Sequence, residues 1–236
     1  MSGGLVLRQL LAGRDFATGD SVAGQMANYV YAIADPDSRA AVLVDPAWSP
    51  VELVGWLAAE EWHLVGVVLT HYHADHAGGS LGGFAVPGVA ELLEVADVPI
   101  HVHADELGWV TRGTGVARRA FVTHAAGDEL VIGAHAVRVL HTPGHTPGSQ
   151  CLLLGGALVT GDTLFLDGCG RTDLPGGDPV ALHRTLASGL SAISDDTAVY
   201  PGHAYAREPS APMGRLRTAN PVLAPLGEEE WLARFS

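Results

Sequence analysis

The chain has 236 residues, of which 47% are hydrophobic and 17% charged, and this balance excludes an intrinsically disordered protein. Its formal net charge of −13 argues against nucleic acid as a partner, because nucleic-acid binders usually present a basic face. Two cysteines outside any CxxC motif argue against a disulfide framework or a cysteine-rich zinc site.

The first half of the chain alternates short apolar segments with turn residues. The turn sequence Asp35-Pro36-Asp37-Ser38 predicts a hairpin between the segments on either side of it. Ser49-Pro50 fits a helix N-cap followed by proline at the first helical position. The elements expected here are strands at 6–11, 28–34, 40–44, 64–69 and 99–102, and helices at 51–61 and 88–97.

In the second half, residues 111–127 begin glycine-rich and show no clear hydrophobic period. They are interpreted as a loop that covers a site. Gly155-Gly156 predicts a tight hairpin turn, and Asp178-Pro179 predicts the start of a helix over 180–190. The other elements expected are strands at 129–132, 136–140, 150–154, 157–160 and 197–200, then a polar C-terminal helix or tail.

The order of these elements favours one domain over residues 1–236. Strands occur in two runs, each followed by a helix, which indicates two sheets packed face to face with helices outside. No apolar stretch reaches the roughly 18 residues needed to span a bilayer. The N-terminus lacks the pattern of a signal peptide, so the sequence predicts a soluble, cytoplasmic protein.

The segment THYHADH, residues 70–76, places three histidines and an aspartate directly after an apolar strand. In an extended segment His71 and His73 lie on one face, because side chains alternate along a strand. Asp75 and His76 follow once the chain has turned. Neutral imidazole and carboxylate suit zinc, iron and manganese, so this loop is predicted to present several ligands to a metal.

Three other residues of ligand type each follow an apolar strand and a turn. His145 lies in LHTPGHTPGS, Asp162 in LVTGDTLF and His203 in VYPGHAY. This repeated placement predicts that the three side chains complete one site with the histidine-rich loop.

The motifs HxHxDH, PGHT, TGD and PGH, in that order, resemble the metallo-β-lactamase superfamily from about residue 28 to about residue 223. The resemblance implies an α/β fold, a four-layer αββα sandwich with the metal site at one edge of the sheets. It also implies a first metal held by His71, His73 and His145, a second held by Asp75, His76 and His203, and a bridging Asp162.

Several branches of that superfamily fit poorly. Asp162 disfavours true β-lactamases, which as a group lack this aspartate. His73, where a glutamate would be expected, disfavours the di-iron flavoproteins. The net charge and the lack of a long insert before His203 disfavour the nucleases. Glyoxalase II-like thioester hydrolases, lactonases and persulfide dioxygenases remain.

The segment GCGRTDLPGGDP is similar to two of these branches. GRTDLPGGDP resembles compact glyoxalase II-like hydrolases, whereas GCGRTD and the later TANPVL also resemble persulfide dioxygenases. Where glyoxalase II has lysine and tyrosine for glutathione, this chain has Arg171 and Thr172, which become the candidate substrate-binding residues. Arg171 could hold a substrate carboxylate or form a surface salt bridge to Asp173 or Asp178. The sequence after His203 is too short for the helical glutathione-binding domain.

The favoured function is a hydrolase of thioester or ester bonds with two divalent metal ions, zinc first and iron or manganese as alternatives. Asp75 would accept the proton of the attacking water. The main alternative is a persulfide dioxygenase with one Fe(II) held by His71, His145 and Asp162. A lactonase and a metal-binding protein without turnover are further alternatives. The expected partner is a small-molecule thioester or related thiol-derived substrate, with no nucleic acid and no membrane.

The remaining histidines are interpreted as structural, with one exception. His101 and His103 form a second HxH, but no DH follows it. His141 precedes His145 in the same segment and is a candidate to orient a ligand. The histidines assigned to packing are His63, His101, His103, His124, His135 and His183.

Overall fold

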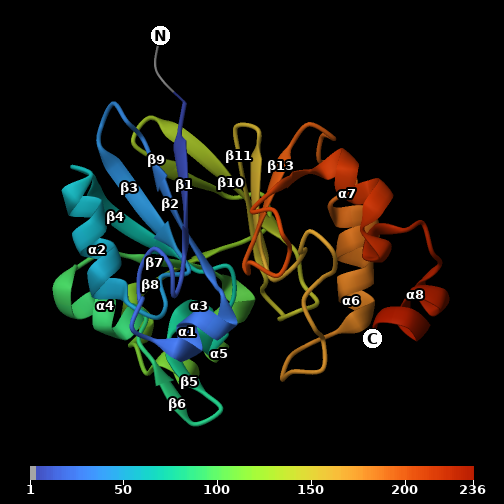
Figure 1. Ribbon diagram of the computed structural model, residues 1–236, viewed down its shortest axis with the longest axis horizontal. Helices are drawn as coiled ribbons and strands as arrows, with labels where there is room; N and C mark the ends of the chain where they lie inside the picture. The colour runs from blue at the N-terminus through green and yellow to red at the C-terminus, as the bar shows by residue number, and fades with distance from the viewer. Residues whose placement is uncertain (1–3) are drawn as a thin grey trace.

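Two six-stranded sheets form the centre of the computed structural model, which describes residues 4–236 (Figure 1). The first sheet contains, in spatial order, β1 (Val6–Leu11), β2 (Tyr29–Ala34), β3 (Ala40–Val44), β4 (His63–Val68), β7 (Ile100–His103) and β8 (Phe121–His124). The second contains β14 (Ala211–Pro212), β13 (Ala198–Pro201), β12 (Ala157–Gly161), β11 (Gln150–Leu154), β10 (His135–His141) and β9 (Glu129–Ile132). A separate hairpin pairs β5 (Gly79–Leu81) with β6 (Phe84–Val86).

The two sheets bury a shared apolar layer. Tyr31 and Ile33 of β2 and Val42 of β3 belong to the same buried cluster as Val139 of β10 and Leu152 of β11. Each of these strands places alternate side chains into that layer, as the pleat requires. The layer fixes the relative position of the two sheets, and therefore of the loops at their edge.

Helices cover the outer faces of both sheets. On the first sheet lie α1 (Ser21–Met26), α2 (Pro50–Ala59), α4 (Val89–Val95) and α5 (Leu107–Thr114), which contribute to one core cluster. On the second lie α6 (Pro179–Arg184), α7 (Met213–Ala219) and α8 (Glu228–Phe235), which contribute to another. Figure 1 shows these two groups on opposite sides of the sheets. The predicted αββα sandwich is confirmed.

Some local predictions were incomplete. Residues 111–127 are not a loop: they contain the end of α5, a 3-10 turn at Arg118–Ala120 and strand β8. The helix ends at Gly115 with φ of 73°, a left-handed cap that glycine adopts without strain. The helix expected over 180–190 changes to π geometry at Thr185–Gly189. Short 3-10 turns at Ala104–Glu106 and Pro221–Leu223 and the helix α3 (Ala74–Ala77) were not expected.

None of the helices among residues 4–236 is long and apolar enough to cross a membrane.

The strand directions explain where the ligand-bearing loops meet. β3 pairs with β4 in parallel, and β12 pairs with β13 in parallel. Loops that leave the carboxyl ends of parallel strands gather at one sheet edge. A backbone bridge between Asn28 and His203 joins the two sheets at that edge.

Candidate metal centre

All seven predicted ligands lie at this edge. Six of them are at least nine-tenths buried, although they are polar, and His73 is partly buried. The segment after β4 supplies His71, His73, Asp75 and His76, and the loops after β10, β12 and β13 supply His145, Asp162 and His203.

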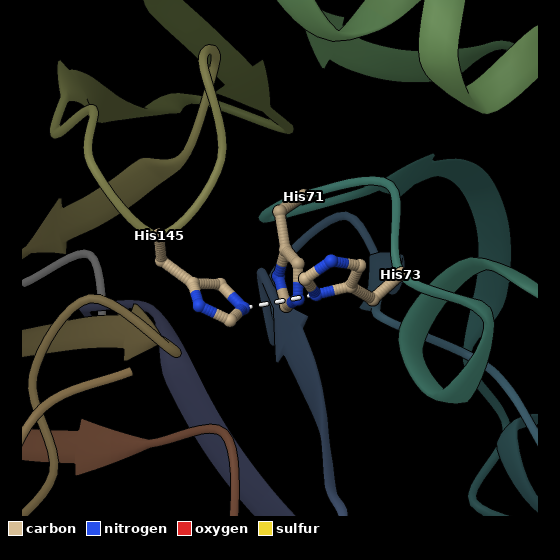
Figure 2. A group of neighbouring side chains, drawn as sticks. All are labelled: His71, His73 and His145. Carbon is tan, nitrogen blue, oxygen red and sulfur yellow. Dashed lines mark hydrogen bonds between the residues drawn. The ribbon is translucent and has the colours of Figure 1, made fainter. Parts of the chain in front are cut away.

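Three imidazoles form the first group. Figure 2 shows His71, His73 and His145 pointing toward one another from two loops. The Nδ1 atom of His73 lies 2.9 Å from Nε2 of His145. One nitrogen from each of the three rings falls within 4.8 Å of the others. Three nitrogens at this spacing can bind one divalent metal ion.

The second group contains Asp75, His76 and His203. The Nε2 atoms of His76 and His203 are 3.2 Å apart, and each lies 3.4 Å from Oδ2 of Asp75. Two nitrogens and one carboxylate oxygen therefore converge on a second position.

Asp162 lies between the two groups. Its Oδ2 atom is 3.7 Å from Nε2 of His145 in the first group and 3.3 Å from Nε2 of His203 in the second. Its Oδ1 atom is 3.4 Å from Nε2 of His76. A single carboxylate thus contacts ligands of both groups, which is the placement of a bridging ligand.

The glycines of the TGD and PGH motifs permit this approach. A Cβ atom on Gly202 would lie 2.3 Å from Oδ1 of Asp162. Gly161 has φ of 47°, and a Cβ there would lie 2.4 Å from the Thr70 hydroxyl oxygen. Side chains at these positions would push the loops apart.

Outer hydrogen bonds orient the imidazoles. The Nδ1 atom of His145 donates to the Arg171 carbonyl oxygen at 2.7 Å, and that of His203 donates to the Met26 carbonyl oxygen at 2.8 Å. A proton held on Nδ1 leaves Nε2 as the lone-pair atom, so each ring presents Nε2 to the site.

Asp45 and Asn28 were not predicted as part of the site. Asp45 accepts from Nδ1 of His76 at 2.9 Å, and from the backbone N–H and hydroxyl of Thr70. Asn28 donates to Oδ2 of Asp75 at 3.0 Å and accepts from the Trp48 indole at 2.9 Å. In the sequence, Asp45 looked only like the end of a strand and Asn28 like the start of one. The sequence feature that could have revealed both residues is a polar side chain within an apolar segment.

Burial and charge prepare the first group for a metal. Burial is the main cause that lowers the pKa of His71 well below its usual value and that of His73 to about 4, and the neighbouring imidazoles lower both further. Burial also lowers the pKa of His145. These three rings are therefore neutral at neutral pH, as metal ligation requires.

In the second group, the acidic residues and the histidines stabilise each other's charged forms. Burial opposes ionisation of Asp75 and Asp162, but the surrounding histidines outweigh it and hold both pKa values below the ordinary range. Burial likewise opposes the charge of His76, yet Asp75, Asp162 and Asp45 outweigh it and raise its pKa to about 9. Protons on this group would leave when a metal binds.

The donor set fits a metal centre. Nε2 of His71 and Oδ1 of Asp162 are buried and have no hydrogen-bond partner among the described residues. An unpartnered buried polar atom costs about 1–3 kcal/mol. Nitrogen and carboxylate ligands in this number suit zinc, iron or manganese.

A cavity of about 920 Å³ opens onto the site. Arg171 lines it, and its guanidinium forms a two-pronged ion pair with Asp173, with both N–O distances 2.6 Å. Thr172 is not among the lining residues. Tyr205 lines the cavity and stacks on His203, with ring centroids 4.6 Å apart.

The other histidines lie apart from the seven. The Nε2 atom of His141 donates to the Pro147 carbonyl oxygen at 2.9 Å, and the His141 ring stacks on His103 with centroids 3.8 Å apart. No hydrogen bond within residues 4–236 joins His141 to a predicted ligand, so its predicted orienting role is not supported. His101 and His124 bond to each other at 2.8 Å, which fits their structural interpretation.

Comparisons with known proteins agree with this geometry. Residues 23–203 match the sequence profile of the metallo-beta-lactamase superfamily. The chain is 37% identical to a hydroxyacylglutathione hydrolase from Alkalilimnicola ehrlichii over 75% of this chain and 62% of that protein. It is 28% identical to PksB from Bacillus subtilis, described as a probable polyketide biosynthesis zinc-dependent hydrolase, over 88% of this chain and 86% of that protein.

A solved structure is also similar. ETHE1 from Myxococcus xanthus superposes with a TM-score of 0.77 at 31% identity, over 97% of this chain and 88% of that one.

Proposed function

The chain belongs to the metallo-β-lactamase superfamily, and on this basis we propose that it is a metal-dependent hydrolase of thioester bonds with two metal ions. The observation that carries the proposal is the position of Asp162, within 3.7 Å of a histidine nitrogen in each ligand group. His71, His73 and His145 would hold one ion, and Asp75, His76 and His203 the other. The hydrolases among its relatives support the same reaction class.

The bound ions would supply a nucleophile at neutral pH by lowering the pKa of a water, and would polarise the carbonyl of the substrate. The protein supplies the rest. Oδ2 of Asp75 is engaged by Asn28, whereas Oδ1 has no hydrogen-bond partner among the described residues. Asp75 is ionised, so Oδ1 can orient the attacking water and accept its proton.

The leaving group favours a thioester over an amide. A thiolate leaves without a proton, so the reaction needs no separate acid beside the metal centre. Apolar side chains of Met26, Leu81, Phe165 and Leu174 line the cavity and provide room for an acyl group. These features support a thioester and leave the acyl group open.

The direct test is thiol release from acyl thioesters without oxygen, using protein reconstituted with zinc. We expect turnover, and we expect Asp75→Asn to lower kcat by about 10²- to 10⁴-fold because the proton acceptor is lost. Asp97→Asn is the matched control, since Asp97 is exposed and does not line the cavity. Equal thiol release by wild type and Asp75→Asn would contradict the assigned role.

A second candidate is a persulfide dioxygenase with one iron. It is favoured by the similarity to ETHE1, and its ligands would be His71, His145 and Asp162. The convergence of Asp75, His76 and His203 within 3.4 Å argues for the two-metal hydrolase, because a one-iron site would leave this group without a metal. Oxygen uptake with a persulfide and no thioester cleavage would support the second candidate.

A further inference from the structure

The cavity beside the metal centre is larger than a small acyl group needs. Its volume of about 920 Å³ is near the upper end of small-molecule sites, which span roughly 300–1,000 Å³. One end is formed by the metal ligands Asp75, His145 and His203. The remainder extends between the β5–β6 hairpin, the end of α5 and the loop at residues 165–175. A substrate that fills the cavity must have a long group attached to the bond that is cleaved.

Two arginines line this cavity, and they differ in whether a carboxylate balances their charge. Arg171 is neutralised by Asp173 through two bonds of 2.6 Å. Arg112 has no carboxylate within 4.0 Å among residues 4–236. In a chain with a net charge of −13, Arg112 is therefore a cation of the cavity wall without an acidic partner.

Stacked aromatic rings hold Arg112 in place. Its guanidinium carbon lies 4.9 Å from the Trp109 ring centroid, and Trp109 stacks on Tyr72 with centroids 5.1 Å apart. The Tyr72 hydroxyl donates to the Pro175 carbonyl oxygen at 2.5 Å. Stacking orients the plane of a guanidinium while its N–H groups stay free to bind an anion.

The same rings connect Arg112 to the metal centre. Tyr72 stands between His71 and His73 in the chain, and its ring centroid is 4.6 Å from that of His73. A series of ring contacts therefore runs from the cavity residues His73 and Tyr72 through Trp109 to Arg112, which also lines the cavity. Backbone packing fixes the far end, because a Cβ on Gly79 of β5 would lie 2.5 Å from the Gly113 carbonyl oxygen.

We propose that Arg112 is an anion-binding subsite, and that the substrate is a thioester whose thiol carrier bears a carboxylate or phosphate away from the sulfur. The substrate class rests on the proposed function, but the subsite itself does not. We assign the anion to the thiol carrier and not to the acyl group, because Arg112 and Gly113 are exposed at the cavity rim. The carrier is the leaving group, and from the rim a polar leaving group can return to solvent. The acyl group then packs against the apolar part of the wall. Carboxylate and phosphate both match the two parallel N–H bonds that a guanidinium offers.

The test measures binding with ligands that cannot be hydrolysed. Isothermal titration calorimetry on zinc-reconstituted protein compares three S-butyl thioethers: of coenzyme A, which carries phosphates, of glutathione, which carries carboxylates, and of N-acetylcysteamine, which is neutral. Wild type should bind at least one anionic thioether about tenfold or more tightly than the neutral one. Arg112→Gln should remove that advantage and leave the neutral thioether unchanged, while Arg112→Lys should keep part of it.

Arg118→Gln is the matched control, since Arg118 is also exposed but does not line the cavity. The thioether that loses most affinity in Arg112→Gln identifies the anion as phosphate or carboxylate. Equal affinity of wild type and Arg112→Gln for all three ligands would overturn the subsite. Arg112-dependent binding without cleavage of the corresponding thioesters would leave the subsite standing and refute the proposed hydrolase.

Discussion

Asp45 lies outside the predicted ligand set, and we expect the proposed second metal position to depend on it more than on any other such residue. Its Oδ2 atom accepts from Nδ1 of His76 at 2.9 Å and from the Thr70 hydroxyl at 2.6 Å, and its Oδ1 accepts from the Thr70 backbone at 2.7 Å. Three donors therefore share two carboxylate oxygens. In Asp45→Asn only one oxygen remains, so at least one buried donor faces an amide N–H.

Two effects of Asp45→Asn follow. Loss of the charged partner of a ligating histidine lowers metal affinity by about 10- to 100-fold. This factor corresponds to about 1.4–2.7 kcal/mol. The unpaired buried donor lowers the free energy of unfolding by about a further 1–3 kcal/mol. Because His76 contacts Asp45 directly, zinc binding at the position formed by Asp75, His76 and His203 should change most.

The assay is a zinc titration of demetallated protein in competition with a chromophoric chelator, with circular dichroism to confirm the fold. Asp97→Asn removes the same charge at an exposed position and should bind zinc like wild type. A folded Asp45→Asn variant with both zinc affinities within twofold of wild type would refute the role assigned to Asp45.

Three other outcomes are expected. Asn28→Ala removes the hydrogen bond to Asp75 and leaves the Trp48 indole without its acceptor. We therefore expect the free energy of unfolding in urea to fall by about 1–3 kcal/mol and kcat to fall as well, and unchanged values for both would contradict this. Burial, followed by His124, lowers the pKa of His101 to about 4, so the unfolded chain binds more protons between about pH 4 and 6.5 and stability falls as the pH drops through that window. His101→Gln should therefore reduce the difference in urea midpoint between pH 7.5 and pH 5, and an equal difference in both proteins would argue against it. Removal of metal by a chelator should lower the melting temperature, since ions that bind only the folded protein stabilise it. Equal melting temperatures for the metal-free and metal-loaded protein would argue against a buried metal centre.

The meeting of the seven predicted ligands at one edge was predictable because each of their loops follows an apolar strand. The apolar runs before His71, Asp162 and His203 predicted strands, and the motifs then predicted which residues meet. The hairpin of β2 and β3 was predictable for the same reason, since its turn residues lie next to one another in the sequence.

Other features depend on contacts between distant segments. Asp45 reaches His76 because β3 pairs with β4 in parallel, and Asn28 reaches Asp75 from the position just before β2, so neither role is visible in local sequence. The helix α5 is short, and its buried residues Leu107 and Val110 give too few repeats to show a period. Its role in placing Arg112 beside the cavity appears only after the β5–β6 hairpin packs on it.

Elemental analysis of protein purified without added metal would show whether the centre holds two metal ions. We expect about two metal ions per chain, zinc or a zinc-containing mixture. About one iron per chain with little zinc would contradict it and favour the one-iron oxygenase.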